Sequence, residues 1–193
     1  QSDERIRNVI WENNHHRKDA SSVALQGQLG ITAVLVSVRN NIMDMNGHPS
    51  ACSPISIAAA NSAGSPAPDF VWVYNNSIYA SNTGTNMRGI ETNGTTGQAT
   101  NLFFRNNAIY APLKTSPVLN FNTGAFPAAP TLQTNSSGTM ITATSAYIDT
   151  TPATAAEYAA ANYAINGGTA VPVYDDYFRV LRTGTMDIGA VLP

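Results

Sequence analysis

The stretch VWVYNNSIYA, residues 71–80, joins two short runs of alternating apolar residues through a pair of asparagines. Similar stretches occur at 9–18 (VIWENNHHRK), 36–45 (VSVRNNIMDM) and 102–111 (LFFRNNAIYA). Apolar residues that alternate with a period of two predict a strand on each side of every pair. The sequence therefore predicts an all-β protein made of internal repeats. The pairs are unequally spaced, and lie at Asn13/Asn14, Asn40/Asn41, Asn75/Asn76 and Asn106/Asn107.

A third apolar piece lies between successive asparagine pairs, at residues 22–26, 54–59, 88–92 and 117–121. Each repeat then contains three short strands. Strands that stack at the usual spacing of about 4.8 Å would form one coil per repeat. The pattern predicts a right-handed parallel β-helix of about four recognisable rungs.

The asparagine pair is predicted to mark a tight corner between two strands of each rung. A single buried amide would be left unsatisfied. Amides stacked in register, at Asn41, Asn76 or Asn107, can instead donate to one another and form a ladder. Asparagine also tolerates the left-handed backbone that such a corner needs.

These rungs and the closing stretch 163–193, with Asp187-Ile188-Gly189-Ala190, resemble the right-handed parallel β-helix superfamily of pectate-lyase-like, polysaccharide-active proteins. The resemblance implies a secreted or cell-surface protein that acts on polysaccharide, here as the C-terminal portion of a lyase-like enzyme. The alternative is a non-catalytic β-helix that binds carbohydrate or serves in assembly, as in a tailspike. The fold alone does not decide between them.

The chain divides into predicted rungs over residues 1–121 and a C-terminal cap over residues 122–193. The first part of this cap is rich in Pro, Gly, Ser and Thr and predicts loops. An alanine-rich run at 153–164 predicts one short helix, with Thr151 as N-cap and Pro152 at the first helical position.

A basic cluster follows the first asparagine pair. Polysaccharide lyases of the resembled fold use a basic residue to take the proton beside a uronate carboxylate, and a cation to neutralise the acid. The resemblance thus implies a possible lyase. The alternative is that these residues form an irregular, solvated first rung, in which His16 falls in the inward column of Met43. The candidate catalytic residues are His15, His16, Arg17 and Lys18.

Aromatic and basic residues also recur one rung apart on the predicted outer face. Stacked aromatic rings on a flat sheet can bind the faces of sugars, and arginine packs favourably on such rings. Two alternatives are that the C-terminal cap covers this face and that it is an oligomer interface. The candidate carbohydrate-binding residues are Trp72, Tyr74, Phe103, Arg105, Tyr79 and Tyr110.

The composition of the chain argues against several classes of partner. Charged residues make up only 11%, against roughly 25% in an average protein. With a net charge of −2, nucleic acid is not an expected partner. No apolar run has the length of a membrane span, no metal-ligand spacing occurs, and no cofactor is expected. Polarity carried by Asn, Thr, Ser and Gly favours a secreted or cell-surface location.

The first rung is predicted to have an open side. Val9, Ile10 and Trp11 would lie there with little above them, beside a row of unpaired main-chain groups. We therefore expect residues 1–7, another chain or a missing N-terminal portion to cover this end.

Overall fold

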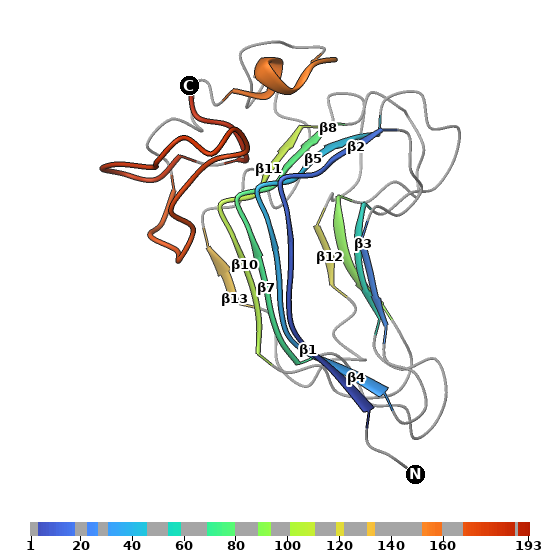
Figure 1. Ribbon diagram of the computed structural model, residues 1–193. Coiled ribbons are helices and arrows are strands. Elements are labelled where there is room, and N and C mark those ends of the chain that lie inside the picture. The colour runs from blue at the N-terminus through green and yellow to red at the C-terminus, as the bar shows by residue number, and fades with distance from the viewer. Residues whose placement is uncertain are drawn as a thin grey trace.

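The computed structural model describes residues 4–17, 23–26, 31–45, 54–58, 69–79, 89–93, 101–110, 119–121, 131–133, 152–159, 168–187 and 189–193. Within these ranges the chain forms strands in parallel sheets and one short 3₁₀ helix, so the protein is all-β (Figure 1). No helix in this part of the chain is long and apolar enough to cross a membrane.

The strands form three sheets in which every pairing is parallel. Sheet A contains β1 (Glu4–Glu12), β4 (Ile31–Arg39), β7 (Asp69–Tyr74), β10 (Leu102–Arg105) and β13 (Thr131–Gln133). Sheet B contains β2 (His15–Arg17), β5 (Ile42–Asp44), β8 (Ser77–Tyr79) and β11 (Ala108–Tyr110). Sheet C contains β3 (Val23–Gln26), β6 (Ile55–Ala58), β9 (Ile90–Asn93) and β12 (Leu119–Phe121).

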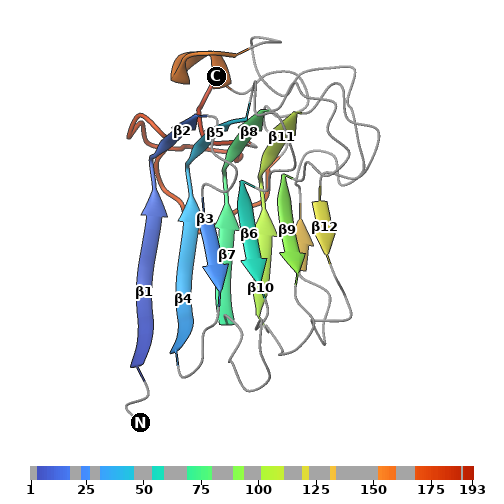
Figure 2. The same ribbon diagram turned by 90° about the vertical axis from the view of Figure 1, so that its right-hand side faces the viewer.

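Successive strands visit sheets A, B and C in turn, as Figure 2 shows for the neighbouring arrows of each sheet. We call β1–β3, β4–β6, β7–β9 and β10–β12 the first to fourth tiers. Each tier contains one of the four asparagine pairs, at the junction of its sheet A and sheet B strands. The prediction of three short strands per repeat is therefore confirmed.

Alternation along sheet A decides which residues form the core. Val38, Val73 and Phe104 are in register in neighbouring strands and are 0% exposed. Trp11 is in register with Val38, yet it is 40% exposed. Burial of such apolar columns is the main favourable contribution to folding, and it weakens at the first tier.

The loop predicted after residue 121 was wrong at one place. Residues 131–133 form β13, which pairs with β10 and extends sheet A beyond the fourth tier. No asparagine pair follows this strand, so the repeat pattern carries no sign of it. The boundary between rungs and cap at residue 121 remains a prediction.

The predicted helix start at Pro152 was also wrong. Pro152 lies before the 3₁₀ helix η1 (Ala155–Tyr158), whose N-cap is Thr154. The side chain of Glu157 accepts the main-chain N–H of Thr154 at 3.0 Å, as in a capping box, and this fixes the start. Thr151 and residues 160–164 of the predicted helix lie outside the described part of the chain.

Candidate functional site

The second asparagine of each pair forms a continuous amide ladder across the tiers. Nδ2 of Asn14 lies 3.0 Å from Oδ1 of Asn41, and Asn41 and Asn76 donate to the next asparagine at 3.0 and 2.9 Å. The main-chain N–H of each donor reaches the same oxygen at 3.1 to 3.2 Å. Asn41, Asn76 and Asn107 are 0% exposed, so the predicted buried ladder is confirmed.

The first asparagine of each pair has a different task. Its backbone is left-handed, with φ between 52° and 57°, as the sequence predicted for the corner. Its side chain turns outward to the C-terminal segment, defined here as residues 168–187 and 189–193. The side-chain amides donate to main-chain oxygens of that segment, from Asn13 to Tyr177 (3.2 Å), Asn40 to Asp175 (2.9 Å), Asn75 to Asp187 (3.1 Å) and Asn106 to Thr169 (2.6 Å).

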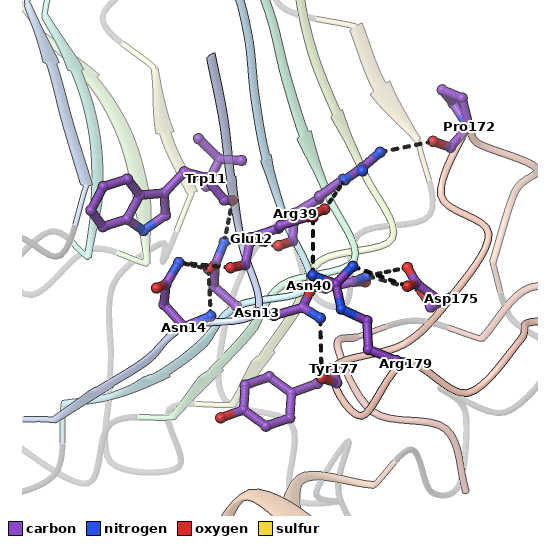
Figure 3. A network of polar contacts seen from close by, with 12 residues as sticks. Trp11, Glu12, Asn13, Asn14, Arg39, Asn40, Pro172, Asp175, Tyr177 and Arg179 are labelled. Atoms are coloured by element: carbon purple, nitrogen blue, oxygen red, sulfur yellow. Dashed lines mark hydrogen bonds and ion pairs between the residues drawn. The ribbon is translucent and has the colours of Figure 1, made fainter.

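Ion pairs fasten the same segment to the first two tiers (Figure 3). Glu12 accepts Arg39 Nε at 2.6 Å and Arg179 Nη2 at 3.2 Å. Arg179 also pairs with Asp175 Oδ2 at 3.2 Å, and Arg39 Nη1 donates to the oxygen of Pro172 at 3.3 Å. These charges, with the four asparagine contacts, hold the C-terminal segment against the corner between sheets A and B (Figure 1).

Arg182 holds this segment together from within. Its Nε donates to the main-chain oxygen of Asp175 at 2.9 Å, and its Nη2 donates to the oxygens of Gly189 and Ala190 at 2.9 and 3.0 Å. The same nitrogen lies 3.4 Å from Oδ1 of Asn40. Burial lowers the pKa of Arg182, but an arginine stays charged at any pH that the protein meets.

A row of three aromatic rings lies on the outer side of sheet A. The rings of Trp72 and Phe103 stack at 6.4 Å and 12°, and Phe70 lies 6.2 Å from Trp72. The guanidinium carbon of Arg105 lies 5.9 Å from the Phe103 ring centre. The row therefore joins neighbouring strands β7 and β10 and ends in a cation.

The C-terminal segment covers one side of this row. Val171 and Val173 form a buried cluster with Tyr74, and Trp72, Phe103 and Met186 pack against it. The alternative that the C-terminal part packs over this face therefore holds for these residues. Tyr74 is only 4% exposed, and burial raises the pKa of its phenol, which the charge of Arg105 partly opposes. Trp72, Phe103 and Arg105 are half-buried.

Phe70, which sequence reasoning missed, is the most exposed ring of the row. It is 39% exposed and its φ is 52°, in the left-handed region. Asn8 in β1, Leu35 in β4 and Asn101 just before β10 hold the same conformation, each one residue before the inward column starts. These four positions form a second corner in each tier, at the start of the inward column of sheet A. The asparagines at two of them were the signal that the sequence offered for it.

Tyr79 and Tyr110, the other predicted carbohydrate-binding pair, stack at 5.9 Å on sheet B. They are 1% and 5% exposed and form a cluster with Tyr158 and Val191. In this arrangement they contribute to the core and offer no surface to a ligand.

The predicted catalytic cluster is divided between the two faces of β2, with His15 and Arg17 on one face. His15 faces the ring of Tyr158, with ring centres 6.1 Å apart. Burial, and then the charge of Arg17, lowers the pKa of His15 below its usual range. Arg17 is exposed and lies 3.6 Å from a carboxylate oxygen of Asp44. Lys18 lies outside the described residues.

His16 lies on the opposite face of β2 from its neighbours. It is in register with the buried Met43, as the sequence predicted for the inward column. Its Nε2 accepts a hydrogen bond from Trp11 Nε1 at 3.2 Å, and the two rings stack at 5.9 Å. His16 therefore belongs to the open side of the first tier, and His15 to the contact with η1.

Comparison with family models, with curated proteins and with solved structures gives no match for this chain. Among the described residues, no group of three or more His, Cys, Asp or Glu side chains is placed to hold a metal ion. Function is therefore inferred from the geometry of this chain's own residues.

Proposed function

We propose that the protein is a right-handed parallel β-helix that binds polysaccharide without cleaving it. Three parallel sheets visited in turn and a buried asparagine ladder support the β-helix. The aromatic row Phe70–Trp72–Phe103, ending at Arg105, is the proposed binding surface. A protein that binds an extracellular polymer works in a secreted or cell-surface location, which belongs to the same proposal.

The observation that carries the proposal is the near-parallel stack of Trp72 and Phe103, 12° apart, continued by the exposed ring of Phe70. Aromatic rings give a large, rigid apolar contact. Binding sites combine such rings with a few polar groups that fix orientation. Arg105 can supply that group, since its guanidinium forms charge-assisted hydrogen bonds to a carboxylate or phosphate. The row therefore suits an acidic polysaccharide.

The backbone of Phe70 gives independent support. A non-glycine residue in the left-handed region costs about 1–3 kcal/mol, and such residues cluster at ligand sites. Asn8 and Asn101 fill the equivalent position with a residue that tolerates it. Leu35 shares this conformation and is 36% exposed, but only Phe70 adds an exposed aromatic ring, 6.2 Å from that of Trp72. Contact of this ring with a ligand would explain why an apolar residue is kept there.

Binding is favoured over catalysis because the basic cluster does not converge. A lyase needs a base and a neutralising cation on one uronate group. Here His15 faces Tyr158, His16 faces inward, and Arg17 pairs with Asp44. His15 and Arg17 share one face of β2, but Tyr158 and Asp44 engage them, and His16 lies on the other face.

The test compares two substitutions at the same kind of corner. Phe70→Asn removes the ring and keeps a residue that suits the left-handed backbone. Leu35→Asn makes the same change on the neighbouring strand without touching an aromatic ring. With pectate, alginate and a neutral glucan as probes in affinity electrophoresis, we expect Phe70→Asn to bind the best polymer about tenfold more weakly. Leu35→Asn should bind like the unsubstituted protein.

Two results would contradict the proposal. One is that the folded protein binds none of the polymers. The other is that Phe70→Asn and Leu35→Asn weaken binding equally. The absorbance of unsaturated products, followed in the same samples, decides the catalytic alternative: its appearance, and its loss in His15→Gln, would establish a lyase.

A further inference from the structure

The first tier has one unpaired side. Among the described residues, β1, β2 and β3 are terminal strands of their sheets, and each pairs with one neighbour, in the second tier. In the later tiers the main-chain N–H of Ile42, Ser77 and Ala108 donates to the preceding tier. His15 has the equivalent position in β2, and its N–H faces the open side. Such an edge is a template for a further strand.

The asparagine ladder ends at this side with Asn14, whose Oδ1 accepts no hydrogen bond from a described group. Asn41, Asn76 and Asn107 each send one amide hydrogen back to a main-chain oxygen of the preceding tier, at Trp11, Val38 and Val73. Asn14, at the corner after β1, has only the bond within its own tier among the described residues, to the main-chain oxygen of Glu12, and Asn41 makes the equivalent bond to Arg39 as well. No described group donates to Asn14 Oδ1, whereas the equivalent oxygen of Asn41 accepts two hydrogen bonds.

Apolar surface accompanies these polar groups. Trp11 stands in the inward column whose other members are 0% exposed, yet it is 40% exposed, and Ile10 beside it is 55% exposed. Only a layer on the open side would bury Trp11 as Val38 is buried. Residues 4–7 do not supply that layer, because they continue β1 in register with residues 31–34.

The C-terminal segment lies next to the open side of the first tier. Tyr177 and Arg179 contact Asn13 and Glu12 of the first tier. Between and after them, Phe178 is 49% and Val180 is 53% exposed. Their main-chain N–H groups both donate to Asp176 Oδ1 at 2.8 Å, so the apolar side chains are presented on a fixed turn.

We propose that the open side of the first tier binds a segment of a different protein, and not a second copy of this chain. This segment consists of two short strands joined by an asparagine corner, running parallel to β1 and β2. Its corner amide would donate to Asn14 Oδ1, its main chain would accept His15 N–H, and its apolar side chains would cover Trp11. Edge-to-edge pairing of two copies fits less well, because two Asn14 acceptors would then face each other. The inference stands apart from the proposed sugar binding.

The probe is a dye-labelled peptide with the sequence of residues 31–44, ITAVLVSVRNNIMD, which is the strand–corner–strand unit of the second tier. Binding to the full chain is measured by fluorescence anisotropy. A matched peptide carries Asn41→Leu, which removes only the corner amide and leaves the protein unchanged. A protein variant, Trp11→Lys, places a charge on the edge, a change that opposes strand addition. In Trp72→Phe, Trp11 is the only tryptophan and its emission reports its burial.

We expect saturable binding of the first peptide, binding at least tenfold weaker with the Asn41→Leu peptide, and a similar loss in Trp11→Lys. The emission of Trp11 should shift to the blue on binding. Equal binding of the two peptides, or binding that Trp11→Lys leaves unchanged, would overturn the proposal. So would the absence of binding, or concentration-dependent dimerisation that Trp11→Lys abolishes, since that assigns the edge to a second copy.

Discussion

Asn76 donates twice to a single atom of Asn107. Its Nδ2 lies 2.9 Å and its main-chain nitrogen 3.2 Å from Oδ1 of Asn107. Asn76 Oδ1 accepts the same two bonds from Asn41, at 3.0 and 3.1 Å. Because all three side chains are 0% exposed, water cannot replace a lost partner. The ladder therefore fixes the register of the tiers as well as their stability.

The first prediction removes one step of this ladder. Asn76→Leu removes the Oδ1 that accepts from Asn41, so the buried main-chain N–H of Asn41 loses its acceptor. It also removes the Nδ2 that donates to Asn107 Oδ1 and to the main-chain oxygen of Val38. A buried polar group left unsatisfied costs about 1–3 kcal/mol, so the free energy of unfolding should fall by at least that amount. Denaturant titration followed by circular dichroism measures it.

The control is Ile78→Leu, a volume-conserving change two residues away in the same buried environment, which should cost less than about 1.5 kcal/mol. An Asn76→Leu protein as stable as the Ile78→Leu protein would show that the ladder contributes no net stability.

The second prediction concerns backbone strain at the outer corner of sheet A. Leu35 has a φ of 60° and is 36% exposed, so its side chain is only partly buried. Leu35→Asn should raise the free energy of unfolding by about 0.5–1 kcal/mol, because asparagine tolerates this conformation. Leu35→Val should lower it, since a branched side chain suits the left-handed region poorly. Thermal unfolding of both variants tests the sign, and a stabilising Leu35→Val would contradict the explanation.

The third prediction is a pH dependence that comes from His15. Its pKa is lowered in the folded protein by burial and by Arg17, and its Nε2 has no hydrogen-bond partner among the described residues. Near and below pH 6.5 the unfolded chain therefore binds more protons than the folded one. Stability is complete above this value and is lost as the pH falls toward and through the pKa of the folded state.

Unfolding midpoints measured from pH 8 to pH 5 test this prediction. His15→Gln should show a smaller loss over that range than the unsubstituted protein, because its side chain does not titrate. The same slope in both proteins would assign the pH dependence to other groups.

The tiers could be predicted from sequence because two local rules agree there. Alternating apolar residues specify the strands, and the asparagine pair specifies a corner with one amide inside. The different tasks of the two asparagines could not be predicted. Asn75 and Asn76 are identical residues, and only the position of the C-terminal segment, far away in sequence, makes one of them a contact to that segment.

The aromatic site was predicted in part for a similar reason. Trp72, Phe103 and Arg105 follow from the strand period, whereas Phe70 lies just outside it, at a corner marked by a backbone angle. Tyr79 and Tyr110 have the same outward direction in the sequence pattern, but Tyr158 and Val191 cover them. Residues that cover a face but lie outside the repeats leave no periodic signal in the sequence. For the same reason β13 and the start of η1, which also lie outside the repeats, were not predicted.

The last prediction separates the two arginines of the C-terminal segment. Arg182 donates to main-chain oxygens of Asp175, Gly189 and Ala190, and these bonds need the planar fork of a guanidinium. Arg182→Lys keeps the charge but reaches fewer of these oxygens. These oxygens keep second donors in Asn40, Asn75 and Tyr177, so the loss is that of the bonds to a charged group, about 1.5–3 kcal/mol each, and the segment should loosen.

Arg179→Lys is the matched control, since Arg179 is largely exposed and its ion pairs to Glu12 and Asp175 do not depend on a buried fork. We expect a clear fall in the free energy of unfolding for Arg182→Lys and little change for Arg179→Lys. Hydrogen exchange locates the effect: amides of residues 189–191 should exchange faster in Arg182→Lys, while the ladder amides Asn41 and Asn76 stay protected. If both variants exchange alike at residues 189–191, the segment is held by its asparagine contacts and not by Arg182.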